Sequence, residues 1–309
     1  MKNKKNIVLA LIAVIIYVVI FSLAQFGVLS RHTQSLLVPI GVNIILAVSL
    51  NLTVGFLGEL TLGHAGFMSV GAYAGCLFTI YCNLPVWIEF PLALIIGGLV
   101  AAIFGVIIGI PALRLNGDYL AIVTLAFGEI IRSVLNNVKF TGGAGGLKGI
   151  DKTSNFTIAY ILVILTLIVI TNVVRSRHGR AIMAIRDNII AAQSVGINIV
   201  YYKLVAFVGA AFFAGVAGVL YGHNLGILKP STFDFNKSIE ILVIVVLGGM
   251  GNITGSVIAA IIITLLPEVL RDLADYRMLI YSIALIVMML FSSNPTLVEF
   301  RKKIFKTKK

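Results

Sequence analysis

Three carboxylates inside long apolar stretches are the residues best placed to do chemistry, namely Glu129, Glu240 and Glu268. A carboxylate in a lipid-buried helix is a candidate for carrying a proton or an ion. Each one has a basic residue three positions away, and these partners are Arg132, Lys237 and Arg271. Because residues three apart lie on one face of a helix, the carboxylates can form ion pairs. This spacing argues against a proton-coupled carrier, which needs a carboxylate free to titrate.

Histidine and cysteine offer little further chemistry. His64 and His223 each stand alone, so we expect hydrogen-bonded structural roles for them and no proton relay. Cys76 and Cys82 lie in apolar sequence with no histidine at ligand spacing, which predicts inert thiols and no metal site. The clustered carboxylates and histidines that a membrane enzyme would need near an interface are not visible in this sequence.

A glycine-rich run, TGGAGGLKG at residues 141–149, comes nearest to a phosphate-binding loop. Its glycines and lysine stand in the wrong order for GxxxxGK[ST], and it does not lie between a strand and a helix. We therefore expect an extracytoplasmic loop and no cofactor in this chain. Nucleotide hydrolysis, if it is used, must belong to another subunit.

The elements that position these residues are membrane helices. Hydrophobic residues make up 59% of the chain and charged residues 12%, against about 25% charged in a soluble domain. This composition predicts an all-α polytopic membrane protein, with residues 1–309 as a single transmembrane domain. The net charge of +12 gathers in short segments between apolar runs and at both ends. That pattern orients helices in a lipid bilayer, so we expect no nucleic-acid partner.

Apolar stretches long enough to cross ~30 Å of hydrocarbon are separated by charged residues. We predict spans near residues 6–30, 36–54, 60–82, 89–114, 119–135, 156–174, 203–229 and 277–299. Residues 240–268 are interrupted by glycines at 248–252, and two short helices there would give ten crossings. A re-entrant hairpin with eight crossings is the alternative. The first span is expected to be an uncleaved anchor, although Ser22, Leu23 and Ala24 look like a signal-peptidase site.

Charge and parity agree on the orientation of the chain. Lys2, Lys4 and Lys5 place the start of the chain in the cytoplasm, and six crossings bring residues 175–203 back to that side. This polar segment between spans six and seven is rich in basic residues, as cytoplasmic segments usually are. The basic C-terminus is also expected in the cytoplasm. The loop with Lys139, Lys148 and Lys152 is an exception, because it falls on the outer face.

Glycine spacing predicts close helix packing. Pairs with GxxxG spacing are Gly71 and Gly75, Gly105 and Gly109, Gly218 and Gly222, and Gly251 and Gly255. Each pair lies on one face of a helix, where the missing side chains let a neighbouring backbone approach. The four pairs together favour a tightly packed bundle.

Two glycine-rich interruptions lie inside apolar sequence, GFLGELTLGHAG at 55–66 and GGMGNITG at 248–255. Non-helical backbone at membrane depth is tolerated only inside protein or along a wet cavity. We therefore predict helix breaks on a translocation path, with ordinary inter-helix turns as the alternative. The candidate residues are Gly58, Gly63, His64, Gly66, Gly248, Gly249, Gly251 and Asn252.

The polar segment has helical periodicity from Arg180 to Val195. Its apolar residues recur at spacings of 3, 4 and 3, at Ile182, Ile185, Ile189 and Ala192. This stripe predicts one short helix, and Gly196 is placed to end it. Such a helix can lie on lipid headgroups or dock into a groove on a partner, and the mixed charge and small residues favour the groove.

The same segment, GRAIMAIRDNIIAAQSVGIN at 179–198, resembles the cytoplasmic coupling segment of branched-chain amino acid ABC transporter permeases of the LivM type. Four further stretches carry the resemblance in the same order, so that it covers nearly the whole chain. They are GFLGELTLGHAGFMSVGAY at 55–73, LRLNGDYLAIVTLAFGEIIR at 113–132, TGGAGGLKGI at 141–150 and VVLGGMGNITGSVIAA at 245–260.

This resemblance implies a permease subunit of an ATP-driven importer of branched-chain amino acids in the bacterial cytoplasmic membrane. The implied partners are a second homologous permease, two ABC ATPase subunits that bind ATP and Mg²⁺, and an extracytoplasmic substrate-binding protein. The implied coupling interface with an ATPase is Gly179, Arg180, Ile182, Ile185, Arg186, Asp187, Asn188, Ile189, Ala191, Ala192 and Gly196. An ABC permease for urea or short amides and an ion-coupled secondary amino acid carrier are the alternatives.

Overall fold

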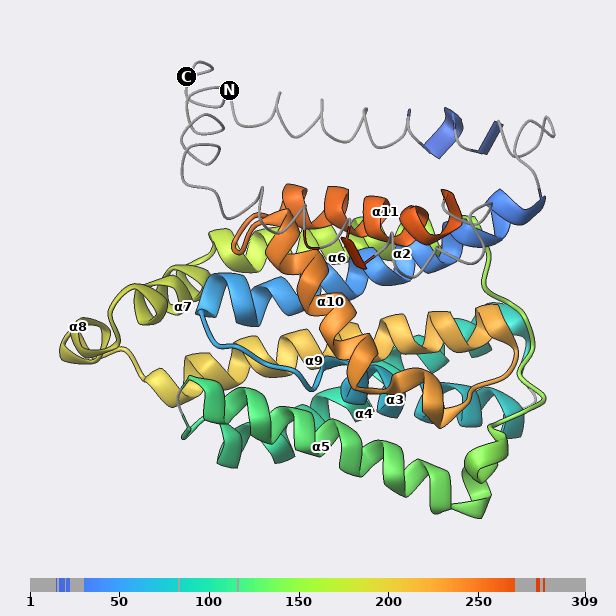
Figure 1. Ribbon diagram of the computed structural model, residues 1–309, viewed down its shortest axis with the longest axis horizontal. Coiled ribbons are helices and arrows are strands. Elements are labelled where there is room, and N and C mark those ends of the chain that lie inside the picture. Colours follow the sequence, from blue (N-terminus) through green and yellow to red (C-terminus); the bar gives the residue numbers. More distant parts are fainter. Residues whose placement is uncertain are drawn as a thin grey trace.

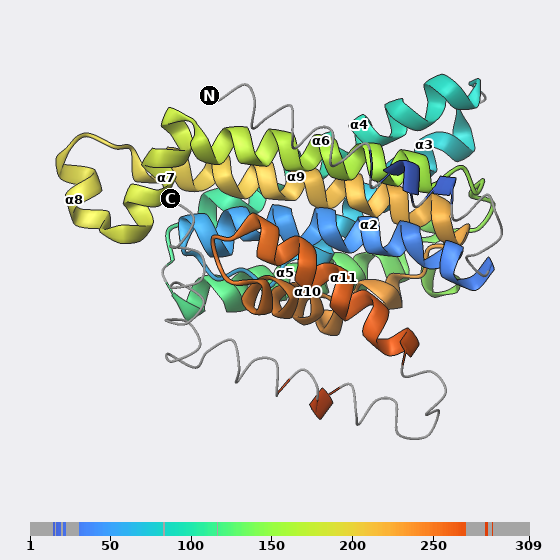
Figure 2. The same cartoon turned by 90° about the horizontal axis from the view of Figure 1, so that it is seen from above.

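The protein is a bundle of long helices. The computed structural model describes residues 31–269 except 83 and 116, and a few positions outside that range. The regular structure in this part of the chain is helical, apart from an isolated bridge between Leu147 and Leu228, which confirms the predicted all-α class. In Figures 1 and 2 the long helices follow one axis, and α7 and α8 project at one end. Figure 1 places residues 138–155 and 226–234 at the opposite end.

The helices follow the predicted spans closely. They are α2 (Arg31–Asn51) with the π-helix η1 (Leu52–Leu57), α3 (His64–Tyr81), α4 (Val86–Ala112), α5 (Asp118–Asn137), α6 (Phe156–Arg175), α7 (Arg177–Asp187), α8 (Ile189–Ser194), α9 (Ile199–Leu225), α10 (Phe235–Gly248) and α11 (Ile253–Val269). Length and apolar composition would let four of the described helices cross a membrane, at Gln34–Leu57, Val86–Ala112, Phe156–Arg175 and Ile199–Leu225. The predicted spans 6–30 and 277–299 and both chain ends lie outside the described range, so the total of ten crossings stays a prediction.

Residues 240–268 form two helices, as the glycines predicted. Figure 1 shows α10 and α11 running in opposite directions, joined by a turn at the α7–α8 end. Gly249 and Gly251 have φ of 88° and 78°, a left-handed region that glycine adopts readily. The predicted packing pair of Gly251 and Gly255 is therefore wrong, because Gly251 lies in this turn and α11 begins after it.

The helices α3, α4 and α9 pack most closely, and glycine is the reason. A Cβ placed on Gly71 would lie 2.7 Å from the carbonyl oxygen of Gly215, and one on Gly215 would lie 2.6 Å from that of Gly97. Main chains from the three helices thus touch without intervening side chains. The other three predicted glycine pairs all lie on these helices.

The helix α3 is shorter than its neighbours. It has 18 residues, or about 27 Å, whereas α4 and α9 have 27 residues each, or about 40 Å. Residues 58–63, called the linker below, run without helical structure from η1 to the start of α3. Figure 1 shows that the linker turns back into the bundle, so α3 begins part-way along it. The helix therefore starts four residues later than predicted.

Candidate functional site

The polar segment between α6 and α9 folds into two short helices, so the predicted single helix is wrong. Asn188 adopts an extended conformation with φ of −159° and ψ of 108°. Its Oδ1 accepts hydrogen bonds from the N–H groups of Ile190 and Ala191, both at 3.0 Å. An asparagine side chain that satisfies these donors begins a new helix, which ends α7 and starts α8. Gly196, with φ of 82°, follows α8 as expected.

Most of the predicted apolar stripe faces the chain's own bundle. Ile182, Ile185 and Ala192 are 1%, 4% and 3% exposed, and they pack with Leu52, Phe56 and Leu57 of η1 and with Ala206 of α9. Ile189 departs from the stripe, because the break at Asn188 turns it outward. The apolar face of α7 is therefore occupied by η1 and is not free to lie on lipid.

The exposed side of the segment includes apolar residues that the stripe does not predict. Ile190 and Val195 are 76% and 75% exposed. Most of the predicted interface residues are exposed with them, and these are Arg180, Arg186, Asp187, Asn188, Ile189, Ala191 and Gly196. Gly179, Ile182, Ile185 and Ala192 are buried within this chain. An open hollow of about 350 Å³ lies beside α8, lined by residues 193 and 196–200.

Arg186 joins this segment to the first glycine-rich interruption. Its Nη1 donates to the carbonyl oxygen of Gly55 at 3.0 Å, while Nε and Nη2 donate to Asp187 Oδ1 at 3.1 and 2.9 Å. The side chain lies against Gly58, where a Cβ would stand 2.6 Å from the arginine Cγ. Gly58 has φ of 81° and ends η1. A π-helix is rare and frequently marks a functional site.

A second contact, between Lys203 and Glu59, joins the base of α9 to the linker. The ammonium and the carboxylate form an ion pair, with the lysine side chain 2% and the glutamate side chain 13% exposed. The two residues are 144 positions apart in the chain. The sequence assigned Lys203 to the end of a polar cytoplasmic segment and offered no signal for a partner so distant in sequence.

The two glycine-rich interruptions meet at one point. Asn51 Oδ1 accepts a hydrogen bond from the N–H of Gly251 at 2.8 Å, and its Nδ2 donates to Ser256 Oγ at 3.0 Å. A Cβ on Gly251 would stand 3.5 Å from Arg186 Nη1. We call Asn51, Gly55, Arg186 and Gly251 the α7 junction. Nothing in the sequence indicates that the two interruptions touch.

The remaining candidates in the second interruption shape the turn between α10 and α11. Gly248 is the last residue of α10, and Gly249 follows it with positive φ. Asn252 Oδ1 accepts from the N–H of Gly255 at 3.2 Å and from Thr254 Oγ1 at 2.8 Å. These residues make a tight inter-helix turn at the end of the bundle, the alternative that the sequence left open. A lining role in a translocation path stays a prediction.

The linker is held by side chains from several helices. Leu62 N–H donates to Thr124 Oγ1 of α5 at 3.0 Å, and just beyond the linker Ala65 N–H donates to Ser238 Oγ of α10 at 3.2 Å. His64 Nε2 lies 2.9 Å from Ser49 Oγ of α2, which confirms a hydrogen-bonded role. The backbone N–H of Leu62 thus has its partner inside protein, as non-helical chain at membrane depth requires.

Gly63 and Gly66 bring the start of α3 against α5. A Cβ on Gly63 would lie 2.6 Å from the carbonyl oxygen of Thr124, and one on Gly66 would lie 2.8 Å from Gly128 Cα. The first interruption therefore combines an extended linker with close backbone packing. His223, the other lone histidine, has Nδ1 2.9 Å from the Asp151 carbonyl oxygen and is also hydrogen-bonded.

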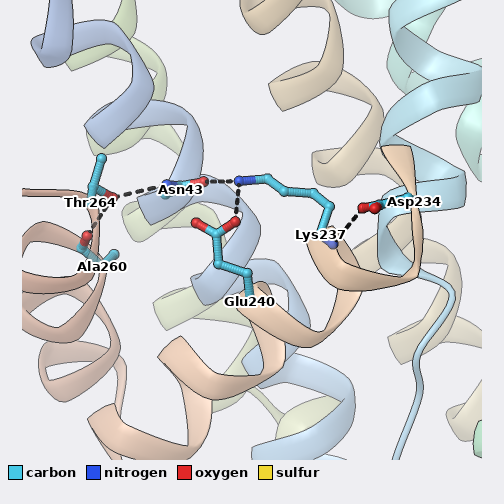
Figure 3. A network of polar contacts seen from close by, with 6 residues as sticks. All are labelled: Asn43, Asp234, Lys237, Glu240, Ala260 and Thr264. Carbon is cyan, nitrogen blue, oxygen red and sulfur yellow. Dashed lines mark hydrogen bonds and ion pairs between the residues drawn. The ribbon is translucent and has the colours of Figure 1, made fainter. Parts of the chain in front are cut away.

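The local ion pairs expected from spacing are present. Arg132 Nη2 lies 2.6 Å from Glu129 Oε2, and Lys237 Nζ lies 3.1 Å from Glu240 Oε2. Figure 3 shows that Asn43 of α2 extends the second pair, accepting from Lys237 at 3.2 Å and donating to Thr264 of α11 at 2.9 Å. The pair expected for Glu268 involves Arg271, which lies outside the described residues. Within the part that the structure describes, no group of three His, Cys, Asp or Glu could hold a metal ion.

Comparisons of the sequence with known proteins find membrane transport permeases. Residues 32–292 match the model of a family described as the branched-chain amino acid transport system / permease component. The high-affinity branched-chain amino acid transport system permease protein LivM of Escherichia coli (strain K12) is 37% identical over 312 residues, covering 90% of this chain and 72% of that protein.

More distant relatives include the LivH permease protein of the same E. coli transport system, which is 27% identical over 71% of this chain and 78% of its own length. The ribose import permease protein RbsC of Haemophilus influenzae is 27% identical over 92% of this chain and 91% of its own. No solved structure matches.

Proposed function

The chain belongs to the family of branched-chain amino acid transport system permease components, and from that premise we propose that it is the membrane-spanning subunit of an ATP-driven importer of branched-chain amino acids. The observation that carries the proposal is the α7–α8 segment. Its buried side rests on a broken helix inside the bundle, and its other side is exposed at one end. A partner that moves the exposed side of such a segment would also move the helices on which its buried side packs.

The nucleotide would be hydrolysed by separate subunits. The sequence contains no GxxxxGK[ST] phosphate-binding loop, so ATP and Mg²⁺ would be held by two ABC ATPase partners. We expect one of them to cover the exposed side of α8 and its flanks, where Asp187, Ile190, Ala191 and Val195 are all exposed. Exposed apolar side chains next to a charged one are typical of a surface that binds a groove on another protein. Closure of the ATPase pair would then move α7 and alternate access to the path.

A second permease completes the membrane part of the transporter. LivM and LivH are both named as permease proteins of one E. coli transport system, and this chain is related to each. Because the relationship to LivM is closer, we assign this chain the LivM position beside a LivH-like partner. Alternating access would then open and close a path between the two permeases.

The opposite end of the bundle would receive the substrate-binding protein. Residues 138–155 form short turns there, and Lys139, Lys148 and Lys152 give them a positive charge. A positive surface would steer an acidic partner surface toward this end. This orientation puts α7 and α8 on the cytoplasmic side of the cytoplasmic membrane. The basic residues at both ends of the sequence favour the same side for the termini.

Branched-chain amino acids suit the interior of this bundle. The ion pairs that Glu59, Glu129 and Glu240 form with basic residues neutralise these carboxylates within the described part of the chain. A path without an unpaired fixed charge favours a small, net-neutral and largely apolar cargo. The selection among such substrates would reside largely in the binding protein.

The test is purification followed by uptake. The tagged chain is expressed in its own host, extracted in a mild detergent, and probed for an ATPase subunit and a second permease. The recovered complex is then placed in liposomes and supplied with the binding protein and labelled leucine or urea. We expect co-purification and leucine uptake that requires ATP and persists with ionophores. Recovery of the chain alone, with uptake abolished by ionophores, would identify a secondary carrier, and ATP-driven uptake of urea in place of leucine would favour the urea permease.

A further inference from the structure

The exposed helix α8 can contact a partner. Its exposure does not explain how a movement at this contact is transmitted to the helices of the bundle. Among the described contacts, two polar ones join the first glycine-rich interruption to α7 and to the start of α9. One is the hydrogen bond from Arg186 to the carbonyl oxygen of Gly55, and the other is the ion pair of Lys203 with Glu59. They hold the two ends of a five-residue stretch.

That stretch, residues 55–59, is the point where the helical path of α2 ends. It includes the end of the π-helix η1 and the first two residues of the linker, which are Gly58 in its left-handed conformation and Glu59. A short stretch of changing backbone geometry can rotate with less cost than the middle of a regular helix. Its two ends are therefore suitable points at which to apply a movement.

The same stretch also contacts the second interruption. Gly55 lies against Gly251 so closely that a side chain at Gly55 would overlap the Gly251 main chain, and Asn51 binds the Gly251 N–H. Beyond the linker, α3 begins and packs against α4 and α9. A displacement of residues 55–59 would reach α3 through the linker and the α10–α11 hairpin through the α7 junction.

Stability alone gives little reason for the Lys203–Glu59 pair. A buried ion pair is often no better for stability than well-packed apolar residues of similar volume, whereas loss of one partner leaves a costly unpaired charge. An ion pair does, however, fix the relative position of its two groups. Such a contact can therefore carry a displacement of α9 to the linker.

On the premise of the proposed function, we propose that Arg186 and Lys203 are positioning residues. Arg186 binds the Gly55 carbonyl and Lys203 binds the Glu59 carboxylate. Through these two contacts they transmit movement of the α7–α8 segment to the two interrupted helices. Neither residue needs to touch the transported amino acid. Arg186 thus acts inward, on its own chain, while the exposed face of α8 acts outward, on an ATPase subunit.

The experiment compares two double variants of the complete transporter in lipid nanodiscs for ATP turnover and in liposomes for uptake. Glu59→Gln with Lys203→Met removes the ion pair at the linker. Lys237→Met with Glu240→Gln removes the pair drawn in Figure 3, whose lysine also donates to Asn43 of α2. We expect the first variant to assemble and hydrolyse ATP while uptake per ATP falls about tenfold. The control should keep the wild-type ratio of uptake to ATP.

A second comparison removes one arginine from α7 at a time. Arg186→Gln should lower uptake per ATP by about fivefold, whereas Arg177→Gln, on an exposed residue of the same helix, should leave the ratio unchanged. This pair decides the question if the ion-pair variant fails to assemble, because Arg186 is partly exposed and its loss leaves the bundle core intact.

The outcomes separate the inference from the proposed function. If the wild-type chain shows no ATP-driven uptake, the proposed function is wrong. If the wild-type chain works and the Arg186 and Lys203 variants keep their uptake, the transmission role is wrong. It is also wrong if uptake and ATP turnover fall in proportion in assembled complexes, since the residues would then serve the ATPase contact and not the connection to the bundle.

Discussion

The helices α3, α4 and α9 meet at three glycines, Gly71, Gly97 and Gly215. Because glycine has no side chain, the three main chains touch there. At the α7 junction and the linker beside it, Gly58 and Gly251 take left-handed conformations, and directional polar contacts hold the chain. Van der Waals contact over a long helix face is lost all at once if the helices separate, so the first region favours one arrangement. A few hydrogen bonds at a bent backbone can re-form in a second arrangement. On the inference drawn above, the packed helices α3, α4 and α9 form the frame of the permease and the junction is its moving part.

The largest effect is expected from a side chain added to the frame. Gly215→Ala would place a methyl group 2.5 Å from Ala101 Cβ and 2.6 Å from the Gly97 carbonyl oxygen, where the backbones must move apart. We expect a loss of about 3 kcal/mol in the free energy of unfolding, seen as a lower melting temperature and aggregation on gel filtration in detergent.

Gly145→Ala is the matched control for that change. Gly145 lies in the loop at the opposite end from α7, with open space around its Cβ position and no positive φ. The control should melt like the wild-type protein. Equal melting temperatures for the two variants would show that close packing at Gly215 is not the frame.

A smaller loss is expected at the junction. Gly58→Ala combines the strain of a residue at φ of 81° with a contact to the Arg186 side chain. We expect about 2 kcal/mol of destabilisation, less than at Gly215 because the arginine can shift, and a lower uptake per ATP.

Gly149→Ala separates these two causes. Its φ of 82° matches that of Gly58, but nothing lies within 4 Å of the Cβ position. Strain alone should therefore cost about 1 kcal/mol of stability in this variant. If the two variants lose the same amount of stability, the contact with Arg186 adds nothing to the cost at Gly58.

The smallest effect is expected at the start of α8. Asn188→Ala removes the side chain that accepts from Ile190 and Ala191, and the loss of a helix cap costs about 1 kcal/mol. Hydrogen exchange should become faster in α8 and stay unchanged in α3. Unchanged exchange in α8 would contradict the division of this segment at Asn188.

The spans could be predicted from the sequence, because each apolar run is bounded by charge and its length is set by the bilayer. The division of residues 240–268 was also predictable, since glycines at 248, 249 and 251 put three residues that weaken a helix within four positions. Local ion pairs such as Lys237 with Glu240 follow from spacing alone.

The functional geometry was harder to predict, for identifiable reasons. Asn188 is compatible with a helix interior and with a helix cap, and only its contacts decide between them. Gly251 has the spacing of a packing glycine but serves a turn. The pairs Lys203–Glu59 and Arg186–Gly55 join residues 144 and 131 positions apart, and such contacts depend on how the helices are arranged.

Cross-linking at α8 tests the central claim most directly. A photo-reactive phenylalanine analogue replaces Ile190, and a second variant carries it at Phe140, which is 61% exposed at the opposite end. Irradiation of the assembled transporter is followed by mass spectrometry of the cross-linked products. We expect position 190 to cross-link to an ATPase subunit and position 140 not to do so. An ATPase cross-link at position 140, or none at position 190 in a transporter that still imports leucine, would show that the ATPase does not dock on α8.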